Sequence, residues 1–524
     1  MKKPPTIDIA SGKPVITSAW TSATRAAESI LDEITYPSLK GTRVMLIIPN
    51  DFYRKKMMAL GPGYVATAMQ RCEIDVSILD CSAYSLDDIE IAKAIIQSGT
   101  KTFAIGALYP QFKEVERICG IIRAVVPKAT IILGGALPSP IPEFVLRKTG
   151  GNIAIIGESE ITIPALMAAL AGEGDISAVK GIAYIKDNQF FDNGKPSLPK
   201  KVTKKEVGWP ALDLYPLEQY INSPKFHPFE QRDRLLPIVT GRGCPYSCNF
   251  CYRVNAYRLR PLDDLFDEME YMIDRFKLNG FHLVDDLLML SEKKIKEFCE
   301  GVLSRGLKIK FSCSGRVNTV TPEVVRLLKK AGCVSIYYGL ESGNQQILNS
   351  MSKKTNIEQI YEAVKLTRES GIFCQYGVMF GQPGENENTL RDSVELIKKI
   401  SYGEYRAQKI FGCVPFPGTG LYDWCKQTGR IKDDRDFYDR YISQDWSLDQ
   451  LPVNMTELPY EEASRLFKSA NNELSSFYIE RMATDWVRVF GGDQSEVACG
   501  QSAGMQHLRQ RVESDANTNT GGKG

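Results

Sequence analysis

The chain has 524 residues, of which 43% are hydrophobic and 24% are charged, and its formal net charge is +2. This length accommodates two or three domains with separate cores, and the near-neutral charge gives no electrostatic case for binding nucleic acid or an anionic membrane. No apolar run is long enough for a transmembrane helix, and Met1–Pro5 is not followed by the apolar run of a signal peptide. Most of the thirteen cysteines are scattered singly, which is typical of free thiols and predicts a reducing, cytoplasmic location.

The first part of the chain predicts a doubly wound α/β domain. Residues 1–42 show only a helical pattern over 25–34 and are interpreted as an N-terminal extension. From 43 to 181, apolar runs alternate with helical patterns; the runs begin near Val44, Val76, Phe103, Thr130 and Ile153. Strands that are apolar throughout and alternate with helices indicate a five-stranded parallel sheet covered on both faces.

Such a sheet binds ligands where its strands end. The segments after the predicted strands contain small or polar residues, among them Asn50, Tyr109, Gly134, Gly135, Gly157 and Glu158. Glycines at these positions allow a large flat ligand to approach the backbone closely, and the alternative is that they only form tight turns. A Gly-x-Gly-x-x-Gly dinucleotide motif is absent after the first strand, which disfavours nucleotide binding.

Residues 182–234 are interpreted as a connector. Residues 182–192 predict a small hairpin, and a basic, proline-marked linker follows at 199–205. Next, an apolar run at 235–240 leads directly into Cys244, Cys248 and Cys251, which are spaced C-x3-C-x2-C.

Three thiolates on one short loop suit an iron–sulfur cluster. A structural zinc site would use a fourth ligand, and no second Cys pair or Cys/His pair follows nearby. A cluster held by three cysteines keeps one iron open for a small molecule. The alternative reading is a zinc or redox loop.

The cysteine spacing, with the aromatic Phe250 before the last cysteine and Tyr252 after it, resembles the signature of radical S-adenosylmethionine (radical SAM) enzymes. The resemblance implies a [4Fe–4S] cluster whose open iron is chelated by SAM. It also implies that an external one-electron donor, such as flavodoxin or ferredoxin, supports cleavage of SAM to a 5′-deoxyadenosyl radical.

A doubly wound domain in front of such a core resembles the cobalamin-binding class of that family, in which this domain is flavodoxin-like. Segments 60–66, 133–136 and 156–162 are similar to those of B12-binding domains. By this resemblance the cobalamin-binding residues are Asn50, Gly61, Gly63, Tyr109, Gly134, Gly135, Gly157 and Glu158. The Asp-x-His-x-x-Gly motif is missing and the only histidines, His227, His282 and His507, lie elsewhere, so cobalamin would have no histidine ligand from this domain. The alternative is a purely structural flavodoxin-like fold.

Residues 235–430 predict a partial (β/α)6 TIM-like barrel, because six apolar runs alternate with five clear helical patterns and the cysteine loop. Those helical patterns cover 262–276, 292–305, 322–331, 357–370 and 389–400. Thr321 and Thr355 are predicted as the N-caps of two of these helices. Chemistry is expected at the carboxyl ends of the barrel strands.

The predicted strand ends carry groups that complement SAM, which presents a carboxylate, an ammonium, a ribose and an adenine. The SAM-binding candidates are Phe250, Tyr252, Asp285, Asp286, Ser314, Arg316, Glu341, Gly377 and Gly381. By the family match, Asp285 or Asp286 would hold the amino group, Arg316 the carboxylate and Glu341 the ribose, while Tyr252 and 377–381 would face adenine. The alternatives are a helix cap for the two aspartates, a structural ion pair for Arg316 and a plain turn for the glycines.

Residues 431–490 are charged and aromatic, and they predict a C-terminal helical cap with an amphipathic helix over 461–481. This helix either covers the barrel mouth as a lid or only buries barrel surface. Residues 491–524 are rich in Gly, Ser, Gln and Asn and predict a disordered tail.

The resemblance implies a cobalamin-dependent radical SAM enzyme, with methyl transfer to an unactivated carbon of a small-molecule biosynthetic intermediate as the first hypothesis. A radical SAM oxidative cyclase or rearrangement enzyme of the same architecture is the second. A third hypothesis, from a different class, is a non-catalytic metal-binding or electron-transfer protein. The catalytic residues and the substrate do not follow from the sequence.

Overall fold

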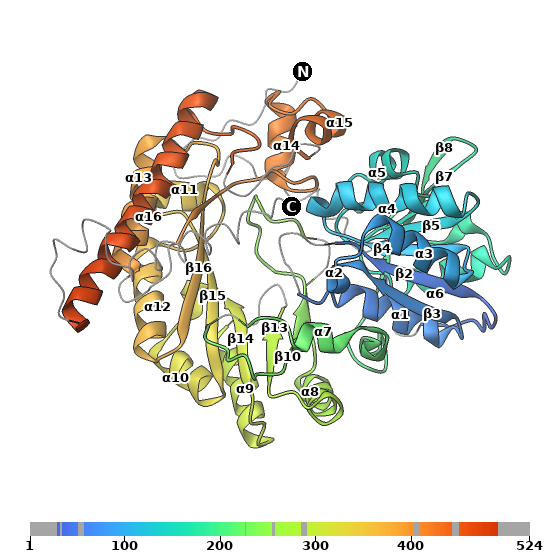
Figure 1. Ribbon diagram of the computed structural model, residues 1–524, viewed down its shortest axis with the longest axis horizontal. Coiled ribbons are helices and arrows are strands. Elements are labelled where there is room, and N and C mark those ends of the chain that lie inside the picture. The colour runs from blue at the N-terminus through green and yellow to red at the C-terminus, as the bar shows by residue number, and fades with distance from the viewer. Residues whose placement is uncertain are drawn as a thin grey trace.

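The computed structural model describes residues 29–31, 34–50, 57–225, 227–253, 257–284, 291–401, 408–442 and 450–490. An N-terminal α/β domain lies beside a half-open barrel, and a long C-terminal helix runs along the far flank of the barrel (Figure 1). Among the described residues, no helix is both long enough and apolar enough to cross a lipid bilayer.

The N-terminal domain is built on a seven-stranded sheet in the order β3-β2-β4-β5-β6-β7-β8. The five strands predicted as parallel are parallel and neighbours in this sheet: β2 (Arg43–Ile48), β3 (Asp75–Asp80), β4 (Thr102–Gly106), β5 (Thr130–Gly134) and β6 (Ile153–Ile155). The strand order reverses between β2 and β4, so the sheet is doubly wound. The flavodoxin-like prediction is confirmed.

The hairpin assigned to the connector belongs instead to this sheet. Strands β7 (Ile182–Lys186) and β8 (Gln189–Asp192) are antiparallel, and β7 pairs with β6. Because β6 is a short, fully buried strand, its free edge needs a partner to satisfy its backbone groups. The first domain therefore extends past residue 181. The helix expected over 25–34 is also wrong where it is described, because β1 (Ser29–Leu31) pairs with β9 (Ser197–Pro199).

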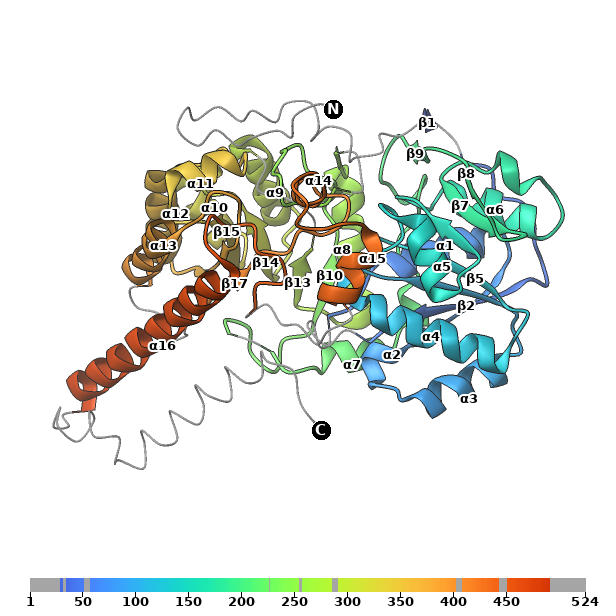
Figure 2. The ribbon, with the colours of Figure 1, turned by 90° about the horizontal axis from the view of Figure 1, so that it is seen from above.

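Helices cover both faces of the sheet (Figure 2). They are α1 (Gly61–Arg71), α2 (Cys81–Tyr84), α3 (Asp88–Ser98), α4 (Phe112–Val125), α5 (Pro142–Thr149) and α6 (Thr162–Leu170). Helix α4 buries an apolar stripe that includes Val115, Ile118 and Ile122, which explains its place against the sheet. After this domain, α7 (Leu217–Ile221) leads into the barrel.

The barrel is a six-stranded parallel sheet in sequence order, as predicted. Its strands are β10 (Leu235–Ile238), β13 (Gly280–Leu283), β14 (Lys310–Gly315), β15 (Cys333–Glu341), β16 (Phe373–Phe380) and β17 (Ile410–Gly412). A separate two-stranded hairpin, β11 (Gly241–Arg242) with β12 (Arg258–Leu259), carries the cysteine loop between its strands. Figure 1 shows the helices packed around the outer face of the barrel strands.

The barrel helices begin and end close to where their patterns predict. They are α8 (Leu262–Phe276), α9 (Glu292–Ser304), α10 (Pro322–Lys330), α11 (Gln345–Ser350), α12 (Ile357–Glu369) and α13 (Glu387–Ile400). Thr321 caps α10 by accepting a hydrogen bond from the amide of Val324. Thr355 does not cap α12, because Asn356 and Gln359 form a capping box there, which satisfies two amides instead of one.

The C-terminal region divides into two parts. Helix α14 (Gly420–Gln427) and α15 (Asp434–Phe437) pack toward the N-terminal domain, where Tyr438 contacts the ring of Phe112 with ring centroids 4.7 Å apart. Helix α16 (Tyr460–Phe490) packs along α13, and Phe467 stacks on Phe380 of β16. The long helix therefore buries the flank of the barrel, and its described part forms no lid (Figures 1 and 2). The predicted tail at 491–524 lies outside the described residues.

Candidate active site

The three cysteines lie together on the loop between β11 and β12. Cys248 is buried, Cys244 is half-buried and Cys251 keeps accessible surface. Burial nevertheless raises the pKa of the Cys251 thiol to about 12, and the neighbouring Cys248 and Glu341 act in the same direction. The loop thus presents the three thiols together, with Cys251 at its accessible surface.

The donor set suits an iron–sulfur cluster. Three thiolates on one short loop are soft ligands, and in a cluster each of them ligates a different iron. Among the described residues, no His, Cys, Asp and Glu side chains are grouped around a single-metal site. Cys244, Cys248 and Cys251 are therefore the residues that would hold a [4Fe–4S] cluster.

The cysteine loop is held by the residues at the end of α11 and after it, a segment that the sequence analysis did not single out. The amide of Asn249 donates to the carbonyl of Met351 at 3.1 Å, and its side chain donates to the carbonyl of Ser350 at 3.3 Å. The Cys248 thiol contacts the carbonyl of Ser352 at 3.9 Å. The loop after α11 therefore fixes the position of the middle cysteine.

Lys353 in that loop brings together two of the predicted SAM-binding residues. Its ammonium pairs with Glu341 at 2.6 Å, and both side chains are nearly buried. Its carbonyl accepts a hydrogen bond from Arg316, while its ammonium lies 5.8 Å from the centroid of the Phe250 ring. No sequence pattern marks Lys353, which is one of two adjacent lysines in a polar turn.

Arg316 is buried and only partly satisfied. Its guanidinium lies 3.7 Å from the centroid of the Tyr246 ring, and its Nε has no hydrogen-bond partner among the described residues. A buried donor without a partner is costly, and a bound carboxylate would satisfy it. The residue therefore fits the predicted role at the SAM carboxylate.

Glu341 has a strained backbone at the end of β15. Its φ is +71°, which is unfavourable for a residue with a side chain, and the pairing of β15 with β16 shifts register at this point. A Cβ on Gly339 would collide with the Glu341 carboxylate, so the glycine makes room for it. Such strain concentrates at functional sites, and here it directs a carboxylate toward Lys353 beneath the cysteine loop.

The remaining SAM-binding candidates do not all join this group. Tyr252 lies against Gly418 and lines a separate cavity of about 400 Å³ between the cysteine loop, the N-terminal domain and α14, so the structure does not place it beside Arg316 and Glu341. Gly381 has φ of +116° in a turn held by Glu385, which accepts from its amide at 2.6 Å. Asp285 and Asp286 lie outside the described residues.

Gly377 and Ser314 lie on the interior of the barrel, beside Tyr337. A Cβ on Gly377 would collide with the Tyr337 hydroxyl, so this glycine accommodates a tyrosine rather than forming a turn. Ser314, Tyr337 and Gln375 are aligned in register on β14, β15 and β16. None of the three forms a side-chain hydrogen bond with the described residues.

Tyr337 and its neighbour Tyr338 differ in their environments. Tyr338 is buried and shares a hydrogen bond with Thr367 at 2.8 Å. Tyr337 is 45% exposed, but desolvation of its hydroxyl, with a further effect of Glu341, raises its pKa to about 12. Tyr337 therefore keeps accessible surface, whereas Tyr338 packs inside the protein.

A second cavity, of about 550 Å³, lies where the strands of the N-terminal sheet end. Five of the predicted cobalamin-binding residues line it: Gly61, Gly134, Gly135, Gly157 and Glu158. The opposite wall includes Val239 and Val284, which follow barrel strands, and Arg242 of the β11–β12 hairpin. The cavity thus lies between the two domains.

The glycines of this cavity fit a large ligand. A Cβ on Gly61 or Gly134 would meet no atom within 4 Å, so the protein itself does not require glycine there. At Gly135, by contrast, φ is +84° and a Cβ would lie 2.6 Å from the carbonyl oxygen of Ala107. The cavity therefore has the open backbone cradle that cobalamin needs, and no histidine is among the residues that line it.

Asn50, Gly63 and Tyr109 do not line the cavity. The Asn50 side chain donates to Glu114 at 3.0 Å, and a Cβ on Gly63 would lie 2.8 Å from Pro210 of the connector. Tyr109 is buried among aromatic rings, including Phe437 with ring centroids 5.8 Å apart. These three residues help to assemble the domain, because their neighbours come from α4, the connector and the C-terminal region.

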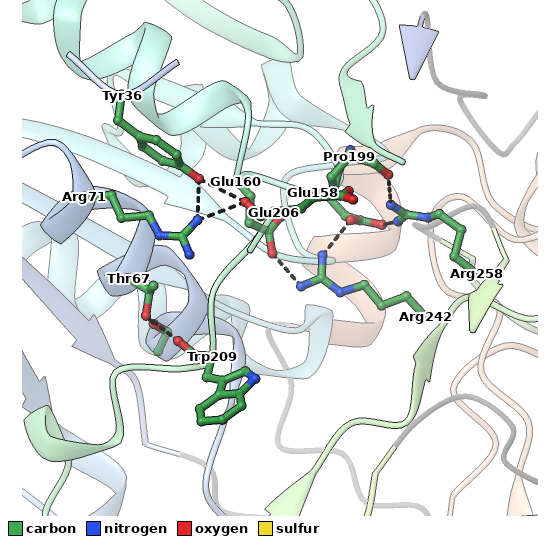
Figure 3. A network of polar contacts seen from close by, with 11 residues as sticks. Tyr36, Thr67, Arg71, Glu158, Glu160, Pro199, Glu206, Trp209, Arg242 and Arg258 are labelled. Atoms are coloured by element: carbon green, nitrogen blue, oxygen red, sulfur yellow. Dashed lines mark hydrogen bonds and ion pairs between the residues drawn. The ribbon is translucent and has the colours of Figure 1, made fainter. Parts of the chain in front are cut away.

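Glu158 is already paired within the protein. It accepts hydrogen bonds from Arg242 at 2.6 Å and from Arg258, while Glu160 accepts from Arg242 at 2.5 Å (Figure 3). Burial raises the pKa of Glu158. Burial acts likewise on Glu160, but the Arg242 guanidinium outweighs it and holds that pKa below its usual range.

Comparison with known proteins agrees with this geometry. The family model of the radical SAM superfamily matches residues 238–397, and that of the B12 binding domain matches residues 53–167. An uncharacterized methyltransferase of Pyrococcus horikoshii is 26% identical over 399 residues, which is 74% of this chain and 83% of the relative. The cytidylyl-2-hydroxyethylphosphonate methyltransferase of Streptomyces wedmorensis is 23% identical, covering 72% of this chain and 80% of that protein.

Among solved structures, the radical SAM methyltransferase TsrM from Kitasatospora setae, with cobalamin and a [4Fe–4S] cluster bound, has a TM-score of 0.60 at 18% identity. The match covers 72% of this chain and 77% of that one, and shows that the two share a fold.

The chain belongs to the radical SAM superfamily, in the class that carries a B12 binding domain. It is an enzyme, and its cofactors are a [4Fe–4S] cluster, SAM and cobalamin.

Proposed function

We propose that this enzyme transfers a methyl group to an unactivated carbon of a small molecule. The observation that carries the proposal is that both domains line the cobalamin cavity. The N-terminal sheet forms one wall, and the barrel side forms the other. Val284 of this wall follows β13, and Gly241 and Arg242 form the strand that leads into the cysteine loop. A substrate in the barrel mouth would therefore meet both cofactor sites.

When bound, the reduced cluster supplies the electron that cleaves SAM, and cobalamin serves as the carrier of the methyl group. The residues of this chain bind and orient the reactants. Cys244, Cys248 and Cys251 hold the cluster, while Arg316 and Glu341 bind the charged and hydroxyl groups of SAM. Lys353 keeps the Glu341 carboxylate in place through their 2.6 Å ion pair.

The interior of the barrel provides the substrate-facing surface in this proposal. Ser314, Tyr337 and Gln375 present uncharged hydrogen-bonding groups that the described residues leave unpaired. Unpaired polar groups in a poorly hydrated space discriminate strongly between ligands that satisfy them and ligands that do not. The substrate would be a small molecule, and the electron donor a protein such as flavodoxin or ferredoxin.

A second candidate is oxidative ring formation in the same architecture. The anaerobic magnesium-protoporphyrin IX monomethyl ester cyclase of Cereibacter sphaeroides is 25% identical over 333 residues, which cover 62% of this chain and 53% of the cyclase. Such a reaction would use the same cluster, SAM and cobalamin sites. The two candidates differ in whether the methyl group of SAM enters the product.

Labelled SAM separates the two candidates. The reconstituted enzyme, SAM with a deuterated methyl group and a reductant are incubated anaerobically with a panel of phosphonate nucleotides and porphyrins, the compound classes named for two of the relatives. Methyl transfer predicts a product that contains the deuterated methyl group, together with S-adenosylhomocysteine and 5′-deoxyadenosine. A product without the label, formed with 5′-deoxyadenosine but without S-adenosylhomocysteine, would contradict the proposal and support ring formation.

A further inference from the structure

The hairpin that carries the cluster cysteines is bound to both domains. Gly241 and Arg242 of β11 pair with Leu259 and Arg258 of β12, and residues 243–257 connect the two strands. All three cysteines lie in that connection. The hairpin therefore anchors both ends of the cysteine loop, while the loop after α11 contacts its middle cysteine.

On one side, buried ion pairs hold the hairpin to the N-terminal domain. Arg242 donates to Glu158 at 2.6 Å and to Glu160 at 2.5 Å, and Arg258 donates to Glu158 and to the carbonyl of Pro199 at 2.7 Å. The side chains of Arg242, Arg258 and the two glutamates are between 4% and 12% exposed. Figure 3 shows both arginines reaching from the hairpin to the segment after β6.

On the other side, the residue after β12 holds the hairpin to the barrel. Arg260 pairs with Glu268 of α8, and both side chains are only 2% exposed. Arg260 also pairs with Asp264 of the same helix at 2.6 Å. Three arginines from one short hairpin thus contact carboxylates in both domains.

The ion pairs on the N-terminal side also form part of the cobalamin cavity. Glu158, Glu160 and Arg242 line it together with Tyr64, over whose ring the Arg242 guanidinium lies at 5.0 Å from the centroid. A molecule in the cavity contacts side chains that are bonded to the cysteine-bearing hairpin. Buried charges keep a discrete geometry, because each displaced partner leaves an uncompensated charge.

We infer that the pairs between Arg242, Arg258, Glu158 and Glu160 form a positioning device that couples cobalamin binding to cluster binding. Cobalamin favours the arrangement of the ion pairs that places the three cysteines correctly, and a bound cluster favours the arrangement that shapes the cavity. Such coupling is reciprocal by thermodynamic necessity and typically amounts to about 5- to 150-fold in affinity. The inference concerns binding and holds whichever reaction the enzyme catalyses.

The test compares cobalamin affinity with and without the cluster. Hydroxocobalamin is titrated anaerobically into the full chain in two forms, metal-free and reconstituted with ferrous iron and sulfide, and binding is followed by its absorbance. The wild-type protein is expected to bind hydroxocobalamin about tenfold more tightly when the cluster is present. Equal affinities of the two wild-type forms would overturn the inference.

Two variants identify the residues that carry the coupling. Glu160→Gln removes one charge but keeps a hydrogen-bond acceptor. Arg242→Lys keeps the charge but cannot contact both glutamates with separate nitrogens. If one variant fails to fold, the other still gives a result. In each variant, the tenfold ratio between the hydroxocobalamin affinities with and without the cluster is expected to fall to about one or two. Both cofactors should still bind. The control is Arg305→Gln, which removes exposed ion pairs on the outer face of α8 and should keep the wild-type ratio. A wild-type ratio in both test variants would overturn the assignment, since the ion pairs would then only be structural.

Discussion

The two large sheets of this enzyme both have candidate ligand sites where their parallel strands end, but the two sites use different parts of the chain. The candidate site at the barrel uses side chains, namely three thiols, Arg316 and Glu341, several of which are paired or strained. The N-terminal sheet uses exposed backbone at Gly61 and Gly134. Side-chain sites depend on single functional groups, whereas a backbone cradle depends on empty space, and the two should therefore respond differently to substitution.

The largest effect is expected at the cluster. Cys248→Ala removes a buried ligand, so the variant should lose its bound iron and form no 5′-deoxyadenosine above background. Iron analysis and chromatography after anaerobic reconstitution measure both. Cys299→Ala, a buried thiol of α9, is the matched control and should keep the iron while the melting temperature falls by a few degrees. Retained SAM cleavage in Cys248→Ala would contradict the cluster assignment.

Cobalamin binding in the cavity should depend on the volume of the side chains there and not on particular functional groups. Gly134→Leu places a side chain in open space, so it should weaken cobalamin binding by about 100-fold or more, equivalent to about 3 kcal/mol, with the melting temperature within about 2 °C of wild type. Cobalamin absorbance and calorimetry measure the two properties. Gly135→Ala should do the opposite and lower the free energy of unfolding by about 1–3 kcal/mol, because its φ is +84° and the Ala107 carbonyl blocks a Cβ. Unchanged cobalamin affinity in Gly134→Leu would exclude this cavity as the site.

Arg316→Gln tests the SAM carboxylate. Loss of one charge-assisted hydrogen bond costs about 1.5–3 kcal/mol, so the dissociation constant for SAM should rise by about 10- to 100-fold. Equilibrium dialysis with the reconstituted protein measures this constant. Arg305→Gln serves as the control, because Arg305 lies at the end of α9 and pairs with carboxylates on the outer face of α8. If both variants bind SAM equally well, Arg316 is only a structural cation beside Tyr246.

Two adjacent tyrosines separate substrate contact from packing. Tyr337→Phe should lower kcat/KM for the methyl acceptor by about 5- to 20-fold without affecting the melting temperature, because only the substrate would pair with this hydroxyl. Tyr338→Phe loses the buried hydrogen bond to Thr367 and should destabilise the fold by about 1 kcal/mol at unchanged kcat/KM. The reverse pattern would remove Tyr337 from the substrate-facing surface.

The smallest expected effect is on the pH dependence of the free energy of unfolding, and it involves Glu385 in the turn after β16. Burial raises the pKa of Glu385 to about 8, against partial compensation by the amides of Gln382 and Gly381. The unfolded chain ionises this carboxyl at lower pH than the folded protein does, so its contribution to stability is complete below about pH 4.5 and declines until about pH 8. Glu385→Gln should therefore flatten the fall in stability over this range. Urea unfolding at pH 5.5 and pH 8 measures it, and an identical pH dependence in the variant would refute the assignment.

The sequence predicted the elements well because their patterns are local. Periodic apolar residues defined α8 to its ends, and C-x3-C-x2-C marked the loop that we propose holds the cluster. Contacts between segments that are far apart in the sequence are not marked by a local pattern. Lys353 meets Glu341 only after the chain turns through α11, and Glu158 meets Arg242 across 84 residues. Tyr109 follows a strand end like a ligand-binding residue, yet its ring packs against the C-terminal region. No local rule distinguishes such a residue from one that lines the cavity.

Metal analysis shows whether one chain binds both an iron–sulfur cluster and cobalamin. The full chain is purified and reconstituted anaerobically with iron, sulfide and hydroxocobalamin, then freed of unbound material and analysed for iron, sulfide, cobalt and zinc. We expect about four irons, about four sulfides and about one cobalt per chain, because one [4Fe–4S] cluster and one cobalamin would then be bound. Stoichiometric zinc in place of iron, or a cobalt content near zero, would contradict this expectation.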